Sequence, residues 1–347
     1  VDYLQPGATF YSNGLSGTWW EADLDRKGEI QALFGEAYID IGDKTQLTLG
    51  FRNYDQDMDL VASNGYYGDM QFGITNEQFN SSASGTIPKI NIKYNISDNL
   101  MVYGTYTEGF RPGGVNRLRP SDPAPKTYDA DYLESMELGF KSTLADGKLT
   151  MNGALYSMDW KDYQTTTYDL DLVAVAFVDN VGNAEITGLE LNMNYAINDT
   201  TSLTYYFNGV DSTLSEDYYQ TGVLYATSGN RLSYMPETSA YVSLDKDFNI
   251  MGNSGYMNID YSYTGDRYNS YEDGAILLPS YGLANFRTGV DFDNTSLEVY
   301  VNNIFDKDAY LSRYNDFADV GSSGYDGFGI RRTRSKPRVI GIRLRYR

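Results

Sequence analysis

The 347-residue sequence contains no cysteine and no histidine. Without cysteine, disulfide bridges and thiol catalysis are excluded. Without histidine, the chain lacks the commonest metal ligand and the usual general base. Long apolar runs are missing too: no stretch of 18 apolar residues occurs and the mean hydropathy is −0.46, which excludes transmembrane helices.

Positive charge is scarce, with 27 Lys and Arg against 47 Asp and Glu and a formal net charge of −20. This balance argues against a nucleic-acid partner, because neutralising phosphates requires a basic surface. Much of the acid falls in expected loops, for example Asp55, Asp57 and Asp59. Their alternate spacing begins some calcium loops, but the glycine and terminal glutamate of an EF-hand loop are missing. A solvated acidic face is therefore favoured over a metal site, and we assign no metal-binding residue.

What the sequence does contain is hydrophobicity with a period of two residues. In the first hairpin Leu33, Ala37 and Ile41 share one parity, and Glu36 and Asp40 share the other, which is the spacing of a β-strand. Short polar turns and long loops alternate between such runs. Thirteen strands are expected, around residues 30–41, 46–52, 90–96, 100–108, 136–140, 149–155, 189–197 and 203–207, two within 238–266, two within 281–303, and one at 340–346.

This alternation is typical of a transmembrane antiparallel up-and-down β-barrel, with short periplasmic turns and long extracellular loops. Each strand is close to the roughly 9–11 residues that a tilted strand needs to cross the hydrocarbon. In the last strand Arg343, Arg345 and Arg347 share one parity, and an arginine facing lipid costs about 2–4 kcal/mol at the midplane. We therefore place these arginines in the lumen and Ile340, Ile342 and Leu344 against lipid.

Residues 1–29 are interpreted as an extracellular loop, because glycines and Pro6 are spread through them. A strand around residues 8–12 or 18–24 is the alternative and would give fourteen. Another loop is expected from Arg52 to about Thr86. Counted back from a periplasmic C-terminus, the strand at 30–41 runs inward, so we expect at least one strand before it.

Five segments together resemble one family, the TonB-dependent outer-membrane receptors of the iron-complex branch. The segments are residues 103–116 (YGTYTEGFRPGGVN), 134–149 (ESMELGFKS, then DGKL), 158–164 (MDWKDYQ), 179–190 (DNVGNAEITGLE) and 301–306 (VNNIFD). They follow the family's order and cover most of residues 30–347.

The resemblance implies a barrel of twenty-two strands filled by an N-terminal plug domain. Residues 30–347 would be the C-terminal portion of that barrel, with the plug and the first strands not in this chain. It further implies TonB-dependent active transport of a scarce solute, such as a ferric siderophore, across the bacterial outer membrane. The implied partners are outer-membrane lipid and lipopolysaccharide, the ferric chelate, and TonB through the absent N-terminal part. No cofactor is expected.

Candidate substrate-binding residues come from two of these segments. After Gly109, Arg111 can bind an anionic ferric chelate bidentately, and Asn116 ends the same glycine-rich run. The alternative is a bulge at the barrel rim in which Arg111 pairs with an acidic neighbour. Trp160 and Gln164 lie where a strand passes into a long loop, and Gln164 is expected to face the ligand cavity. For Trp160 an interfacial aromatic girdle is favoured, and the ligand cavity is the alternative.

Other functions remain as alternatives. A passive porin-like channel of about fourteen strands needs no plug, and TonB-dependent uptake of a non-iron nutrient, such as cobalamin or an oligosaccharide, needs the same fold. A soluble all-β module such as a propeller predicts internal repeats, which are not found. Glu134 and Glu137, or Glu185 and Glu190, could pair as an acid and a base, but no nucleophile motif accompanies them, so no catalytic residue is assigned. The missing histidine argues against haem ligation through imidazole.

Overall fold

The computed structural model describes residues 3–9, 18–66, 72–116, 124–168, 176–314 and 331–346. Fourteen strands form one antiparallel sheet in the order β1-β2-β3-β4-β5-β8-β9-β12-β13-β16-β17-β20-β21-β24. Their bounds are β1 Tyr3–Thr9, β2 Thr18–Ile41, β3 Thr45–Tyr66, β4 Phe72–Ser97, β5 Leu100–Arg111, β8 Asp131–Leu144, β9 Leu149–Lys161, β12 Ala184–Asn198, β13 Thr201–Leu214, β16 Thr238–Ile250, β17 Asn253–Thr264, β20 Tyr281–Phe292, β21 Thr295–Asn302 and β24 Val339–Tyr346.

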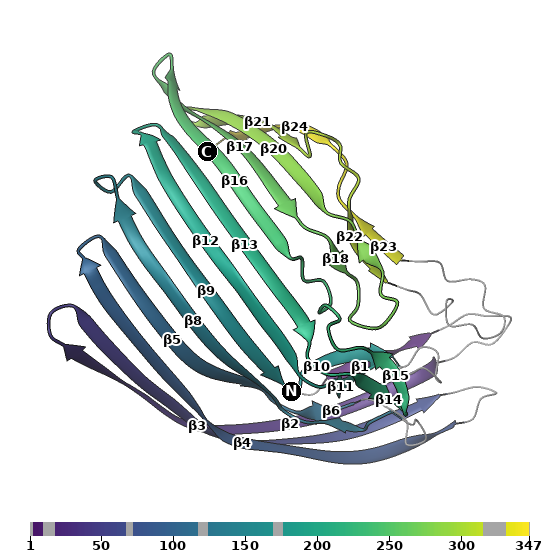
Figure 1. Ribbon diagram of the computed structural model, residues 1–347. Coiled ribbons are helices and arrows are strands. Elements are labelled where there is room, and N and C mark those ends of the chain that lie inside the picture. Colours follow the sequence, from purple (N-terminus) through teal and green to yellow (C-terminus); the bar gives the residue numbers. More distant parts are fainter. Residues whose placement is uncertain are drawn as a thin grey trace.

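Each strand of the sheet pairs with the next one along it, and the sheet curves as the wall of an open barrel (Figure 1). Tight turns lie at one end, as at Gly42 and Gly147, where the backbone φ is positive. The opposite end carries the long loops. These loops contain five two-stranded sheets, which pair β6 (Gly114–Val115) with β7 (Thr127–Tyr128), β10 (Gln164–Tyr168) with β11 (Ala176–Asn180), β14 (Tyr218–Gln220) with β15 (Val223–Ala226), β18 (Arg267–Tyr268) with β19 (Leu277–Leu278), and β22 (Tyr310–Tyr314) with β23 (Arg331–Arg334).

All thirteen expected strands are present. The expected antiparallel up-and-down arrangement is confirmed, and β1 runs antiparallel before β2 as a fourteenth strand. Residues 18–24 are extended, but they belong to the start of β2 and add no strand of their own. Of the alternative strand at residues 8–12, residues 10–12 lie outside the described part of the chain.

The loop interpretation of residues 1–29 is wrong for the backbone that is described. Tyr3–Thr9 and Thr18–Glu29 are strand, and Gly28 pairs with Met58 across the ladder. A glycine weakens a strand but does not remove its backbone hydrogen bonds, so a long ladder carries it. Whether these residues are extracellular stays a prediction.

The loop expected between Arg52 and Thr86 is also wrong, since β3 continues to Tyr66 and β4 begins at Phe72. With 22 and 26 residues, these strands are about twice as long as a membrane crossing requires. Beyond the hydrocarbon both faces of a hairpin meet water. The apolar alternation that marks a membrane strand therefore disappears, while the backbone ladder continues.

The two faces of the sheet differ as the sequence predicts. One face, here the apolar face, carries large side chains that stay exposed, among them Leu138 at 64%, Ile340 at 70% and Ile342 at 73%. The other, the polar face, carries the charged partners. There Arg343 Nη1 donates to Glu298 Oε1 at 2.7 Å, and Asp260 is 6% exposed. Within the described residues, the structure contains no helix long and apolar enough to cross a membrane.

Candidate solute-binding face

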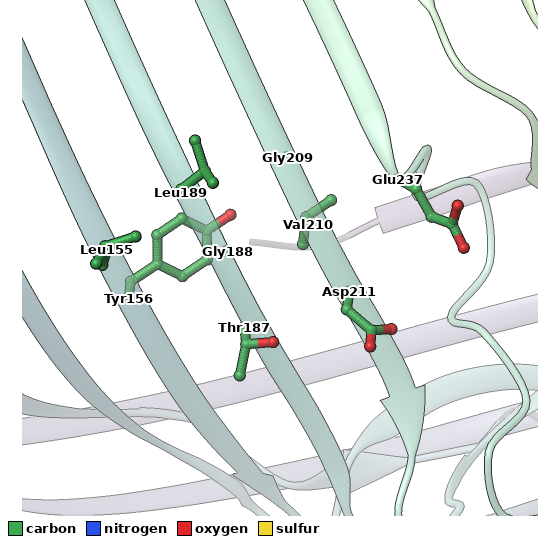
Figure 2. Close-up of a pocket in the computed structure, with 9 residues that line it drawn as sticks. All are labelled: Leu155, Tyr156, Thr187, Gly188, Leu189, Gly209, Val210, Asp211 and Glu237. Carbon is green, nitrogen blue, oxygen red and sulfur yellow. The ribbon is translucent and has the colours of Figure 1, made fainter.

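Tyrosine rings cover glycines along the polar face. The ring of Tyr103 on β5 lies over Gly139 on β8, so a Cβ at Gly139 would stand 2.5 Å from the ring. Tyr156 on β9 covers Gly188 on β12 in the same way, at 2.4 Å (Figure 2). Glycine is required at such positions because the ring approaches the backbone itself. The polar face is thus lined by flat-lying rings whose hydroxyls donate hydrogen bonds, as Tyr103 does to Glu137 Oε1 at 2.5 Å.

A polar hollow of about 470 Å³ lies on this face between β13 and β20. Tyr206 and Tyr241 stand side by side in it, with ring centroids 6.0 Å apart. In the same hollow Asn258 Nδ2 donates to Ser243 Oγ and to Asp245 Oδ1, both at 2.7 Å. Arg287 Nε donates to Asn258 Oδ1 at 3.0 Å. Rings and amide groups of this kind suit a polar solute with flat faces.

The hollow in Figure 2, of about 550 Å³, is of another kind. Its lining includes Leu155 and Leu189, which project from the apolar face and are 59% and 42% exposed. Gly209, which has no side chain, and Glu237 also line this hollow. Because Leu155 and Leu189 belong to the apolar face and not to the face lined by tyrosine rings, we assign this hollow no role in solute binding.

Three of the four predicted site residues meet around one carboxylate at the long-loop end of the sheet. Asp131 opens β8, is 1% exposed and lies opposite Arg111, the last residue of β5. Arg111 forms an ion pair with Asp131 through Nε and Nη2. Trp160 Nε1 donates to Asp131 Oδ2 at 2.9 Å, and the backbone N–H of Gln164 donates to the same oxygen at 3.1 Å.

The Arg111 side chain completes this Asp131 cluster. Its Nη2 donates to the carbonyl oxygen of Gln164 at 2.7 Å, and its guanidinium carbon lies 4.7 Å from the centroid of the Trp160 ring. A cation over an indole face is a favourable electrostatic contact. The Arg111 side chain as a whole remains 47% exposed at the long-loop end of the sheet. The alternative considered for Arg111, pairing with an acidic neighbour, is therefore present in the structure.

The side chains of Gln164 and Asn116 form hydrogen bonds with backbone groups and do not point into an open cavity. Gln164 Nε2 donates to the carbonyl oxygens of Asp129 at 2.7 Å and Pro112 at 3.1 Å. Asn116 lies apart from the Asp131 cluster, is 5% exposed, and bridges two loops: its Nδ2 donates to Pro125 O and Val178 O, and its Oδ1 accepts from Val178 N. Both side chains fix the loop between β5 and β8 against the loop between β9 and β12.

Trp160 does not belong to an aromatic girdle on the apolar face. It shares the parity of Tyr156, contacts Tyr163 edge-on with centroids 4.6 Å apart, and packs against a buried cluster formed by the loops and the adjoining ends of β12 and β13. We call this set the loop core: Val181, Ala184, Ile186, Leu214, Tyr218, Tyr225, Ala226, Leu232 and Tyr271.

The loop core joins the loops that follow β9, β13 and β17. Tyr218 donates to Asp179 Oδ2 at 2.6 Å, and Tyr225 donates to Glu272 Oε2 at 2.5 Å. Burial raises the pKa of Tyr218 and Tyr271 well above the usual value for tyrosine. At its surface, side-chain hydrogen bonds from Thr227 and Asn230 lower the pKa of Asp273. The loops are thus one packed unit above the polar face.

Sequence reasoning missed Asp131, the centre of the Asp131 cluster with Arg111, Trp160 and Gln164, which we also call the rim cluster. It stands three residues before the segment that begins at Glu134, and no spacing in the sequence links it to Trp160. The available signal was the position of Asp131 in the period-two alternation of β8. In β8, Asp131 falls on the face of Glu137, which is the polar face, at the rung opposite Arg111.

The fold and this polar face define the class: a wall of a membrane β-barrel of the receptor type. The family described as TonB dependent receptor-like, beta-barrel, matches residues 1–304, and the chain belongs to it. The metal-pseudopaline receptor CntO of Pseudomonas aeruginosa is 24% identical over 296 residues, covering 83% of this chain and 38% of the receptor. The pesticin receptor of Yersinia pestis is 24% identical over 265 residues, covering 76% of this chain and 37% of that receptor.

Among solved structures, the ferric yersiniabactin uptake receptor FyuA from Yersinia pestis has a similar fold, with a TM-score of 0.77 and 18% identity. The match covers 94% of this chain and 47% of that one. The chain thus spans less than half the length of these relatives. The family is one of receptors rather than enzymes.

Proposed function

We propose that the chain is the C-terminal barrel portion of a bacterial outer-membrane receptor, which imports a ferric siderophore or a similar metal complex with energy from TonB. One observation carries the proposal. A sheet of the TonB-dependent receptor family separates an apolar face from a face lined with tyrosine rings, and packed loops cover one end of that second face. Relatives whose names include metal-pseudopaline, pesticin and ferric-pyoverdine receptors support the choice of solute.

In this proposal the residues of the chain bind and position the solute and carry out no catalysis. Arg111, held by Asp131 and Trp160, presents its exposed part to an anionic chelate. Gln164 and Asn116 keep the surrounding loops in place. The barrel portion proposed for residues 30–347 begins earlier in the chain, because β1 starts at Tyr3. A plug and a TonB-contacting segment would belong to the rest of the receptor, and the bacterial outer membrane is its location.

Uptake of radioactive iron tests the proposal. A strain lacking the receptor gene is supplied with a panel of ferric siderophores, and uptake of at least one of them is expected to be lost and restored by complementation. The same uptake should vanish in a TonB-deficient strain. Unchanged uptake of every ferric chelate in the deletion strain would contradict iron transport, and uptake that persists without TonB would favour the passive channel.

A second candidate solute is a metal complex that contains no iron, or another non-iron nutrient such as cobalamin or an oligosaccharide. The name of the metal-pseudopaline receptor, which specifies no iron, favours the first of these. Growth of the deletion strain under limitation for other metals, cobalamin or sugars separates these cases, since only the true solute becomes limiting.

The role of Arg111 has its own test in the complete receptor. Arg111→Gln removes the charge, so the chelate concentration for half-maximal uptake should rise several-fold because a charge-assisted contact is lost. Lys161→Gln, which removes an exposed charge that pairs with Glu134, is the matched control and should leave that concentration unchanged. Equal behaviour of the two variants would remove Arg111 from the binding site.

A further inference from the structure

A short basic segment stands out in this acidic chain. Residues 331–338 read RRTRSKPR and carry five positive side chains and no carboxylate, whereas the whole chain has a net charge of −20. The segment comprises β23 and the link to β24 (Figure 1). Neither the rim cluster around Asp131 nor the loop core includes any of it. These two clusters therefore do not account for its charge.

Backbone and side-chain hydrogen bonds fix this segment at the long-loop end of β21 and β24. Ser335 N donates to Ala309 O at 2.9 Å, and Asn303 Nδ2 donates to Lys336 O at 2.9 Å. Arg338 N donates to Asp306 Oδ1 at 2.8 Å. The positive side chains therefore start from an anchored backbone.

The charges of the segment are only partly neutralised by the protein. Arg334 pairs with Asp308 at 2.6 Å, and the guanidinium carbons of Arg332 and Arg334 lie 5.5 and 5.1 Å from the ring centroid of Tyr310. Neither Lys336 nor Arg338 has a carboxylate partner for its side chain anywhere in the described ranges. Two carboxylates, Asp306 and Asp308, stand beside five exposed positive side chains, which are Lys307, Arg332, Arg334, Lys336 and Arg338.

Apolar surface continues directly from this basic group. Ile340, Ile342 and Leu344 are 70%, 73% and 69% exposed and share the parity of Arg338. The register continues this stripe across the sheet, from Ile340 to Val301 and from there to Phe286. Phe305, next to Asp306, is 72% exposed. An exposed aromatic ring and basic side chains at the end of an apolar stripe are typical of the membrane–water interface.

Given the outer-membrane location proposed above, we propose that Lys336 and Arg338, flanked by Arg332 and Arg334, bind the phosphates of an outer-leaflet glycolipid of the lipid A class. Its acyl chains lie along Ile340, Ile342 and Leu344. The long-loop end of such a barrel faces the outer leaflet, where the headgroup phosphates stand at the level of the basic side chains. Arginine and lysine bind phosphate through charge-assisted hydrogen bonds, and these are strongest where the apolar surface next to them excludes water.

The test measures lipid binding to the complete receptor purified in a neutral detergent. Diphosphoryl lipid A, its dephosphorylated form and inorganic phosphate are titrated separately, and bound lipid is counted by native mass spectrometry. The wild type should bind diphosphoryl lipid A at least tenfold more tightly than the dephosphorylated form. The double variant K336Q/R338Q should lose roughly 25-fold in affinity, about fivefold for each positive charge removed near an anionic lipid.

Lys148→Gln is the matched control, because Lys148 is an exposed lysine in a tight turn at the opposite end of the sheet. It should bind lipid A as the wild type does. The proposal is overturned if K336Q/R338Q retains wild-type affinity, if the dephosphorylated lipid binds equally well, or if inorganic phosphate competes at the concentration of the lipid. Iron uptake by the wild-type receptor is measured in parallel. Phosphate-dependent lipid A binding without uptake of any ferric chelate would overturn only the proposed function, and uptake without a preference for the diphosphoryl lipid would overturn only the lipid site.

Discussion

Arg111 and Asp131 face each other across β5 and β8 at the rim, and their ion pair is the centre of a cluster drawn from four strands, β5, β8, β9 and β10. The same carboxylate accepts the indole N–H of Trp160 from β9 and the backbone N–H of Gln164 from β10. Removing a partner of a buried carboxylate is destabilising because it leaves the charge uncompensated. The rim cluster therefore couples the position of the β9–β12 loop to the barrel wall.

Asp131→Asn should release this loop. The substitution removes the negative charge that Arg111 faces, and about 1–3 kcal/mol of stability should be lost, less than for a fully buried pair because Arg111 is partly exposed. Limited proteolysis within residues 162–183 is the measurement, and cleavage should become several-fold faster. Lys161→Gln, which breaks an exposed pair with Glu134, should leave the rate unchanged. Equal rates for the two variants would show that Asp131 does not hold the loop.

Gly139→Ala should destabilise the barrel wall. The new Cβ would stand 2.5 Å from the Tyr103 ring, and displacing that ring should cost about 1–3 kcal/mol. Urea titration of the refolded receptor in detergent measures the free energy of unfolding. Gly28→Ala is the control, since no atom lies within 4 Å of the Cβ it would add.

The Tyr103→Leu background identifies the cause of that loss. With the ring removed, Gly139→Ala should cost less than about 0.5 kcal/mol, because all three nearest atoms belong to the Tyr103 side chain. A cost that stays the same in both backgrounds would mean that the ring is not the reason for the glycine.

The strands of the barrel wall were predictable because the alternation of apolar and polar residues is visible within each strand. Every second residue meets lipid, so the alternation of Leu47 and Leu49 with Gln46 and Thr48 indicates a strand and its two faces without knowledge of the partner strand. That constraint ends where the hydrocarbon ends. The outer part of β3, with Asp55, therefore looked like a loop although its ladder to β4 is continuous.

The rim cluster was only partly predictable for the opposite reason. Arg111, Trp160 and Gln164 stood out through their segments, but their common partner is 20 to 33 residues away from each along the chain. Such a contact depends on strand register and on how the loops pack over the rim. The loop core around Tyr271 has the same origin, and no periodicity in the sequence marks it.

Leu138→Arg should cost about 2–4 kcal/mol of stability, because its side chain is 64% exposed on the apolar face and would place a charge against lipid. Asn192→Arg, on the polar face of β12, adds the same charge where water is present and should change stability by less than about 0.5 kcal/mol. Urea unfolding in lipid bilayers measures both variants. Equal costs, or a larger cost for Asn192→Arg, would reverse the assignment of the two faces.

Alkaline pH should open the loop core before the barrel wall unfolds. Burial raises the pKa of Tyr271 above that of tyrosine in an unfolded chain, near 10. The stabilising effect of the protonated phenol is therefore complete below pH ~10 and is lost as the pH rises through the pKa of the folded state. Absorbance at 295 nm should show Tyr218 and Tyr271 ionising well above pH 10, together with the opening of the loops. Tyr271→Phe should remove part of this late phase. Complete ionisation of all tyrosines in one phase near pH 10, in the wild type and in Tyr271→Phe alike, would mean that these loops do not form a packed core.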